Sequence, residues 1–79
     1  MKVTVVCFGK MRDYLPGDGS RNRAEVEIEG PATIRDVVTA LGAPAEEVFA
    51  LLLDGAQSRL DEEVHDGSEV TLMPPFTGG

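Results

Sequence analysis

The sequence predicts one small α+β domain in which a single helix packs across one face of a mixed sheet. Three observations predict it: a valine-rich segment at the N-terminus, a second segment with strict apolar–acidic alternation, and one segment with helical apolar spacing. At 79 residues the chain has room for one domain, because domains typically have about 100–200 residues. Its apolar residues (42%) and charged residues (27%) lie in the ordinary globular range, which argues against general disorder.

The first predicted strand is Lys2–Phe8. Its β-branched residues fall on both faces, which is typical of an interior strand covered on both sides. A connection follows, from Gly9 to Asn22. Within it, helical spacing predicts a short helical turn at Met11, Tyr14 and Leu15.

The second predicted strand is Arg23–Glu29, which alternates apolar and acidic residues without a break. A period of two predicts one buried face and one face in water. The apolar face holds Ala24, Val26 and Ile28, and the acidic face holds Glu25, Glu27 and Glu29. We expect the acidic face either to be solvated or to meet a basic partner.

One helix is predicted to begin after Thr33, which is a good N-cap, with Asp36 near the positive end of the helix. Its apolar stripe fills the i, i+3, i+4 and i+7 positions with Ile34, Val37, Val38 and Leu41. Gly42 ends the helix, and a proline soon afterwards prevents its continuation. One further turn is predicted at Pro44–Glu47, with the proline at its first position.

The continuous apolar run Phe49–Leu53 predicts a buried strand. The Asp54-Gly55 pair that follows is a strong turn signal, and Gln57–Leu60 is predicted as a short return strand. Asp61–Gly67 reads as a polar connection.

The last predicted strand is Glu69–Met73, with Val70 and Leu72 facing inward. Pro74-Pro75 ends it, because proline cannot donate a backbone hydrogen bond. The order of elements is that of the ubiquitin-like β-grasp, a mixed sheet of four to five strands with one main helix packed across it. We therefore divide the chain into a β-grasp domain, residues 1–73, and a flexible C-terminal tail, residues 74–79.

Most patterns that carry chemistry are absent from the sequence. Cys7 is the only cysteine and His65 the only histidine, so we expect no disulfide, no metal site and no active site formed by this chain alone. We expect Cys7 to be a small buried apolar residue and His65 to be a solvated loop residue.

The charge distribution narrows the choice of partners. The net charge is −7, with +3 over residues 1–23 and −10 over residues 24–79. An acidic domain repels phosphate backbones, which disfavours nucleic acid as a partner, and it attracts a partner with a basic patch. With no apolar run near the roughly 18 residues of a membrane span and no signal peptide, the expected compartment is the cytoplasm and no membrane partner is expected.

The C-terminal segment stands apart from the rest of the chain. Pro74-Pro75 predicts a stiff, extended base. Gly78 and Gly79 have no side chains, so they pass where any Cβ would clash. The segment therefore predicts a stalk whose tip enters another protein's site, and the unique group at that tip is the α-carboxylate of Gly79.

A terminal carboxylate is a poor electrophile until it is converted to a mixed anhydride with AMP. A sulfur nucleophile then displaces AMP and leaves a thiocarboxylate, which can pass its sulfur on. The same activation permits an isopeptide bond to a lysine. Because the chain carries no ATP-binding motif, a separate activating enzyme would have to use the ATP.

Three stretches give the sequence a family resemblance: Val3–Gly9, Asp66–Val70 and Pro74–Gly79. Together with the order of elements, they resemble the MoaD/ThiS family of sulfur-carrier proteins over essentially the whole chain. The Pro-Pro-x-x-Gly-Gly ending is more typical of MoaD, the small subunit of molybdopterin synthase, than of ThiS. Two positions depart from the pattern: Asp54 stands where many relatives have asparagine, and Phe76 is larger than its usual counterpart.

The resemblance implies that a MoeB-like enzyme adenylates Gly79, and that a sulfur donor then yields the thiocarboxylate. The chain would be the carrier subunit of a two-subunit sulfurtransferase, inserted into a MoaE-like large subunit and donating sulfur for the molybdopterin dithiolene. It would bind no cofactor of its own. The implied partner contacts are Phe8, Pro75, Phe76, Thr77 and Gly78. Three alternatives remain open: a ThiS-like carrier for thiazole or another metabolite, a ubiquitin-like protein modifier, and a non-covalent interaction module.

Overall fold

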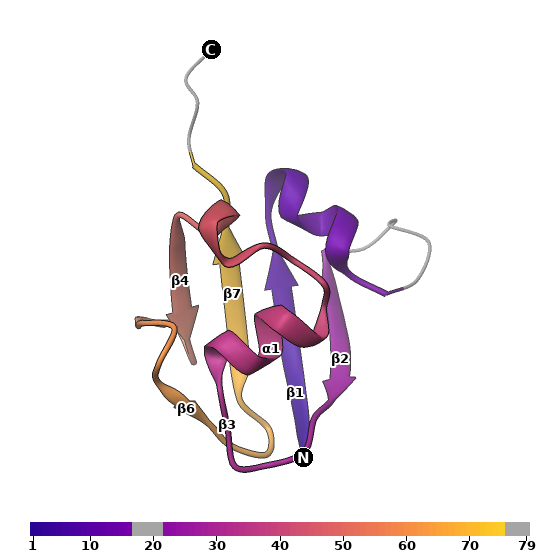
Figure 1. Ribbon diagram of the computed structural model, residues 1–79, viewed down its shortest axis with the longest axis vertical. Coiled ribbons are helices and arrows are strands. Elements are labelled where there is room, and N and C mark those ends of the chain that lie inside the picture. The colour runs from indigo at the N-terminus through magenta and orange to yellow at the C-terminus, as the bar shows by residue number, and fades with distance from the viewer. Residues whose placement is uncertain (17–21, 76–79) are drawn as a thin grey trace.

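The computed structural model describes residues 1–16 and 22–75. Its main sheet has five strands in the order β2–β1–β7–β4–β5 (Figure 1). The first and last strands of the chain, β1 and β7, pair in parallel, and the other pairings of this sheet are antiparallel. The strands are β2 (Arg23–Glu27), β1 (Lys2–Cys7), β7 (Glu69–Met73), β4 (Ala50–Leu53) and β5 (Ala56–Gln57).

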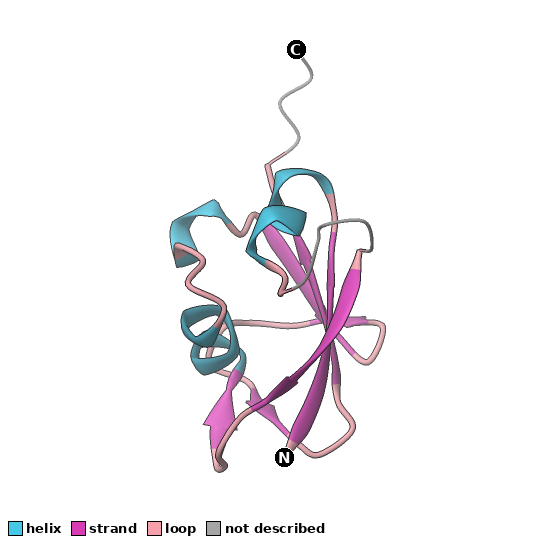
Figure 2. Cartoon of the chain, turned by 90° about the vertical axis from the view of Figure 1, so that its right-hand side faces the viewer, coloured by secondary structure: helices cyan, strands magenta, loops and turns pink. Residues whose placement is uncertain are grey.

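The helix α1 (Ile34–Ala40) lies across one side of this sheet (Figure 2). Two short 3₁₀ helices, η1 (Gly9–Tyr14) and η2 (Ala45–Glu47), follow β1 and α1 respectively. A separate two-stranded ladder joins β3 (Ala32–Thr33) to β6 (Glu63–Val64). The arrangement confirms the predicted ubiquitin-like β-grasp. Within the described residues, no helix is long and apolar enough to cross a membrane.

The core lies between α1 and the two central strands of the sheet. Nine of its side chains are at most 1% exposed, and burial of each aliphatic or methionine side chain among them contributes roughly 1.5–3 kcal/mol. They are Val3, Val5 and Cys7 of β1, Val70 and Leu72 of β7, Ile34, Val37 and Val38 of α1, and Met11 of η1. The prediction that Val70 and Leu72 face inward is therefore confirmed, as is the buried stripe of the helix at Ile34, Val37 and Val38; the fourth stripe residue, Leu41, is half-buried. The first strand is interior, as predicted, between β2 and β7.

The start of α1 is fixed by a reciprocal cap. The Asp36 N–H donates to Thr33 Oγ1 (3.3 Å), and the Thr33 N–H donates to Asp36 Oδ2 (2.9 Å). Such a capping box satisfies two backbone donors that a helix N-terminus otherwise leaves unpaired. The helix stops where predicted. Gly42 adopts a φ of +79°, and a right-handed helix cannot continue through a residue with this backbone conformation.

Four details of the second half differ from the predictions. The apolar run does not form a uniformly buried strand: β4 begins at Ala50, Leu51 is its only fully buried residue, and Phe49 is 71% exposed. The return strand is β5, which pairs at Ala56–Gln57 rather than at Gln57–Leu60. A two-residue hairpin turn imposes this earlier pairing, since Asp54 (φ +53°) and Gly55 (φ +87°) both adopt positive φ.

The segment Asp61–Gly67 is not simply a polar connection. It contains β6, whose Val64 is buried and pairs with Ala32 of β3. Through this ladder Ala32, just before α1, and Val64 are both buried in the core. The extra turn after α1 also begins one residue later than predicted, with Pro44 as the N-cap of η2 rather than its first residue.

Candidate functional site

The described part of the C-terminal segment leaves the fold at the end of β7. Two phenylalanines hold that end from either side. The Phe8 N–H donates to the Leu72 carbonyl (3.1 Å), and the Phe49 N–H donates to the Met73 carbonyl (2.8 Å). Because β7 has a neighbour on each side up to its last residue, the point where the chain departs is fixed.

The same two phenylalanines are the exposed large hydrophobic residues of the described chain. Phe8 is 46% exposed and Phe49 is 71% exposed. Exposed aromatic side chains with nothing packed over them are typical of surfaces that bind another protein. We call this pair, together with the exposed Pro75, the exit surface.

Pro74 is seated against the turn that follows β1. Gly9 has a φ of +57°, and a Cβ added there would lie 2.9 Å from Cγ of Pro74. The contact is therefore possible only with glycine at position 9. It fixes the direction of the chain for one residue beyond the sheet, which brings the base of the C-terminal segment beside η1.

The two 3₁₀ helices meet near this end of the sheet, on the side covered by α1. The Tyr14 hydroxyl of η1 donates to Glu47 Oε1 of η2 (2.9 Å), and this hydrogen bond raises the pKa of Tyr14 above its ordinary value. Lys10 Nζ lies 4.0 Å from the same carboxylate. These contacts join two connections that are distant in sequence at the end of the sheet where β7 stops (Figure 1).

The structure places the predicted site residues unevenly. Phe8 and Pro75 are both exposed at the exit surface, where a partner can contact them. The other predicted residues, Phe76, Thr77, Gly78 and Gly79, lie outside the described residues. Sequence reasoning missed Phe49, because it counted this residue as the first member of a buried strand. Its position as the first residue of the predicted run, close to the polar turn at Glu46 and Glu47, was the available signal.

The residues weighed as reactive groups behave as expected. Cys7 is fully buried in β1, and burial raises the pKa of its thiol to about 11. His65 is exposed. Among residues 1–16 and 22–75, no group of three or more His, Cys, Asp or Glu side chains is placed to hold a metal ion.

The model of the Mut7-C ubiquitin family matches residues 1–78. No curated protein matches the sequence. Several solved structures share the fold, each with less than 25% identity, so the likeness is one of fold.

Small archaeal modifier protein 1 from Haloferax volcanii superimposes with a TM-score of 0.76 at 22% identity, covering all of both chains. The putative molybdopterin converting factor subunit 1 from Pyrococcus furiosus has a TM-score of 0.69 at 24% identity, over 94% of this chain and 97% of that one. A Helicobacter pylori complex of molybdopterin-converting factor subunits 1 and 2 contains a chain with a TM-score of 0.62 at 20% identity, with full coverage of both. The ubiquitin-like fold and the MoaD-like character of its neighbours are thus confirmed.

The burial of Cys7 predicts a thiol that does not react in the folded protein. At pH 8 a thiol reagent should label the native chain at least about 100-fold more slowly than the chain in urea, because labelling requires opening of the core. The raised pKa of Cys7 also makes stability depend on pH, because the folded state holds the thiol proton more tightly than the unfolded state does. The stabilisation from the protonated thiol is complete below the ordinary pKa of 9.0 and is lost as the pH rises towards about 11.

Two measurements check this prediction. Labelling is followed by mass spectrometry with and without urea, and urea unfolding is compared at pH 8 and pH 10.5 for the native chain and for Cys7→Ala. Rapid labelling of the folded chain, or the same loss of stability at high pH in both proteins, would contradict it.

Proposed function

This chain belongs to the Mut7-C ubiquitin family, and we propose that it is a sulfur carrier that works through the α-carboxylate of Gly79. The observation that carries the proposal is the Pro-Pro-Phe-Thr-Gly-Gly sequence joined to the last residue of a central strand. That strand is held on both sides at its end, and two exposed phenylalanines, Phe8 and Phe49, flank the point of departure.

The proposed chemistry takes place at the carboxylate of Gly79. An activating enzyme transfers AMP from ATP to this carboxylate and releases pyrophosphate. A sulfur nucleophile then attacks the acyl carbon and displaces AMP. Sulfide gives the thiocarboxylate directly; a persulfide on a donor protein gives an acyl disulfide, whose S–S bond is cleaved by a second thiol, so that the thiocarboxylate is released and the two donor-side sulfurs form a disulfide. The fold contributes position and recognition, and the buried Cys7 takes no part in holding sulfur.

We propose a MoaE-like large synthase subunit as the protein that receives the charged tail and a MoeB-like enzyme as the activator. The Helicobacter pylori complex supports the first partner, because there a chain with this fold is bound to a second subunit of molybdopterin-converting factor. The sulfur acceptor would then be the pterin precursor of the molybdopterin dithiolene. A ThiS-like role, with thiazole or another metabolite as the product, uses the same carboxylate and differs only in the protein that receives the tail. We propose the cytoplasm as the compartment for these steps.

A second candidate is attachment of the chain to lysine side chains of other proteins. Its support is the fold likeness to small archaeal modifier protein 1, which has the higher TM-score of the structures compared above. Both functions begin with the same acyl-adenylate, and they differ in whether sulfur or a lysine amine completes the reaction.

The first test extends the chain by one alanine after Gly79. The native protein, incubated with ATP, the activating enzyme and a sulfur donor, should gain the mass that corresponds to exchange of one oxygen for sulfur at Gly79. The extended variant should lose more than about 99% of this product, because misplacing a reacting group by even about 1 Å costs on the order of 100-fold. Glu46→Ala, a change at an exposed residue, is the control and should react normally. Equal turnover of the extended and native chains would overturn the proposal.

The second test concerns the exit surface. Phe8→Ala and Phe49→Ala should each weaken binding to the large subunit by about tenfold or more, as aromatic anchors do at interfaces. Because both side chains are exposed, the free energy of unfolding should change by less than about 1 kcal/mol. Arg35→Ala, on the exposed surface of α1, is the control. Calorimetric titration measures the affinities, and unchanged binding by both phenylalanine variants would show that the exit surface makes no contact.

A further inference from the structure

The strand β2 forms one edge of the main sheet. Its hydrogen bonds to β1 alternate: the Cys7 N–H donates to the Asn22 carbonyl, and Met1 and Ile28 exchange bonds at the other end. In an antiparallel ladder every second residue forms hydrogen bonds with the neighbouring strand. Since Asn22 bonds to Cys7 and Ile28 bonds to Met1, the N–H and C=O groups of Ala24 and Val26, which lie between them, also point towards β1. The N–H and C=O groups of Arg23, Glu25 and Glu27 therefore point away from the sheet, along an edge that no other described strand covers.

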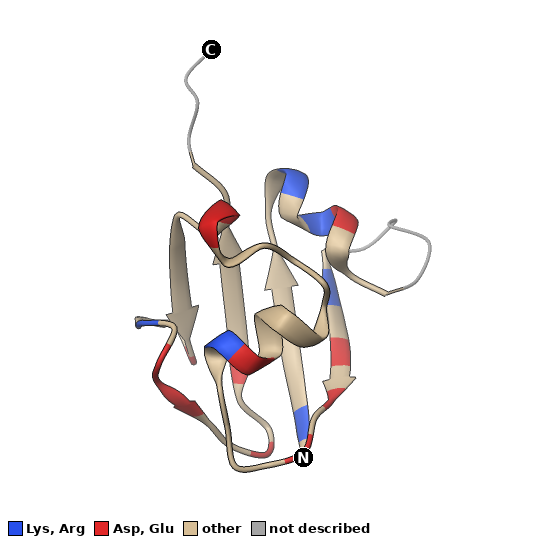
Figure 3. Cartoon of the chain, in the orientation of Figure 1, with Lys and Arg blue, Asp and Glu red and all other residues tan. Residues whose placement is uncertain are grey.

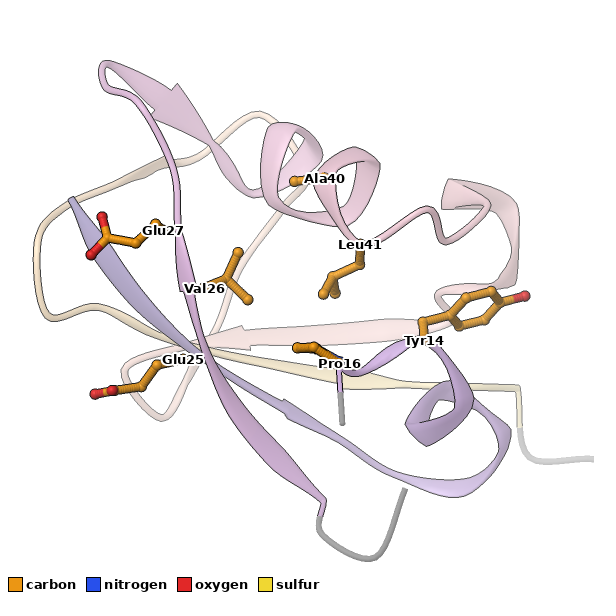
Figure 4. A pocket seen from close by; sticks show the side chains of 7 residues that line it. All are labelled: Tyr14, Pro16, Glu25, Val26, Glu27, Ala40 and Leu41. Atoms are coloured by element: carbon orange, nitrogen blue, oxygen red, sulfur yellow. The ribbon is translucent and has the colours of Figure 1, made fainter. Parts of the chain in front are cut away.

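A groove runs along the inner side of this edge. It has a volume of about 450 Å³ and lies between β2 and the C-terminal end of α1 (Figure 4). Val26 and Leu41 point into it from opposite walls, and Pro16 closes its end. Val26 is only half-buried although it belongs to the apolar face of β2. The groove therefore offers apolar surface that residues 1–16 and 22–75 leave uncovered.

The outer side of the same edge is acidic. Glu25 and Glu27 are exposed, and their side chains point away from Val26 (Figure 4). The ribbon of β2 carries the red of acidic residues in Figure 3. On β1, Glu25 lies opposite Thr4 and Glu27 lies opposite Lys2, and no ion pair among the described residues involves either glutamate. A second hollow of about 380 Å³ borders Thr4, Arg23 and Glu25 on this face. The basic residue at this end, Arg23, is paired with Glu69 (3.7 Å). The edge thus presents Val26 on the side of the helix and, on the other side, two glutamates that have no ion-pair partner among the described residues.

We propose that the edge of β2 binds an extended segment of a partner protein in which lysine or arginine alternates with aliphatic residues. Such a segment would add a sixth strand by pairing with the free backbone groups of Arg23, Glu25 and Glu27. Because side chains alternate along a strand, its basic residues would lie beside Glu25 and Glu27. Its aliphatic residues would enter the groove between Val26 and Leu41. This interface is separate from the exit surface and does not depend on the chemistry at Gly79.

The probe is a six-residue peptide of alternating lysine and valine, blocked at both ends and titrated into the full-length ¹⁵N-labelled protein. Binding should slow hydrogen exchange at the amides of Glu25 and Glu27 and shift the resonances of Val26 and Leu41. N-methylation of the peptide amides that face the protein should abolish binding, because it removes the donors needed for pairing. A peptide that alternates glutamate and valine should bind at least about tenfold more weakly.

A charge-reversal pair tests the acidic contacts. The double variant Glu25→Lys/Glu27→Lys should bind the lysine–valine peptide with an affinity lower by about tenfold or more. The matched control Glu46→Lys/Asp61→Lys makes the same change in net charge at exposed positions elsewhere and should stay within about twofold of the native affinity. Circular dichroism checks that both variants are folded.

Several results would overturn the proposal. The first is that the peptide fails to bind at millimolar concentration. A second is an equal loss of affinity in the two double variants, and a third is a set of perturbed resonances that lie away from β2. Protection of the Glu25 and Glu27 amides in the free protein that rises with its concentration would also overturn it, since a second copy would then occupy the edge.

Discussion

The parallel pairing of β1 with β7 is the contact on which the rest of the structure depends. It joins the first strand of the chain to the last, so the sheet closes only when both ends have been brought together. Val5 and Val70 are directly opposite each other in this ladder and are fully buried. The same ladder continues into the bond between the Phe8 N–H and the Leu72 carbonyl. A single set of hydrogen bonds thus organises the core and sets where the C-terminal segment leaves it.

This arrangement separates recognition from chemistry. Within the described residues, the one cysteine is buried in the core, and no cluster of metal-binding side chains is present. What the body does present is a pair of exposed phenylalanines at the end of β7 and an acidic, unpaired edge along β2. In the proposed function the reactive atoms belong to Gly79, and the domain determines which proteins they reach.

The sequence predicted the elements with strong periodicity and missed those without it. Alternation over Arg23–Glu29 and the i, i+3, i+4, i+7 stripe of α1 are long enough to identify a strand and a helix, although the strand itself ends at Glu27. The ladder of β3 with β6 was missed because two residues show no period, and its partners lie about 30 residues apart in the chain. The exposure of Phe49 was missed because an unbroken apolar run does not show which of its side chains the rest of the fold covers. The edge position of β2 depends on strand order, which follows from tertiary pairing. The roles proposed for the residues from Phe76 to Gly79 are inferred from the sequence alone.

The central claim is that the α-carboxylate of Gly79 is the working group of this protein. It is tested most directly by isolating the untagged protein from cells that express it at native level and analysing its C-terminal peptide by mass spectrometry. The proposed function predicts a peptide ending at Gly79, with sulfur in place of one oxygen in part of the population, or a Gly79–lysine linkage if the modifier function holds. A chain that continues beyond Gly79, or one that carries only an unmodified carboxylate under all growth conditions, would contradict the claim.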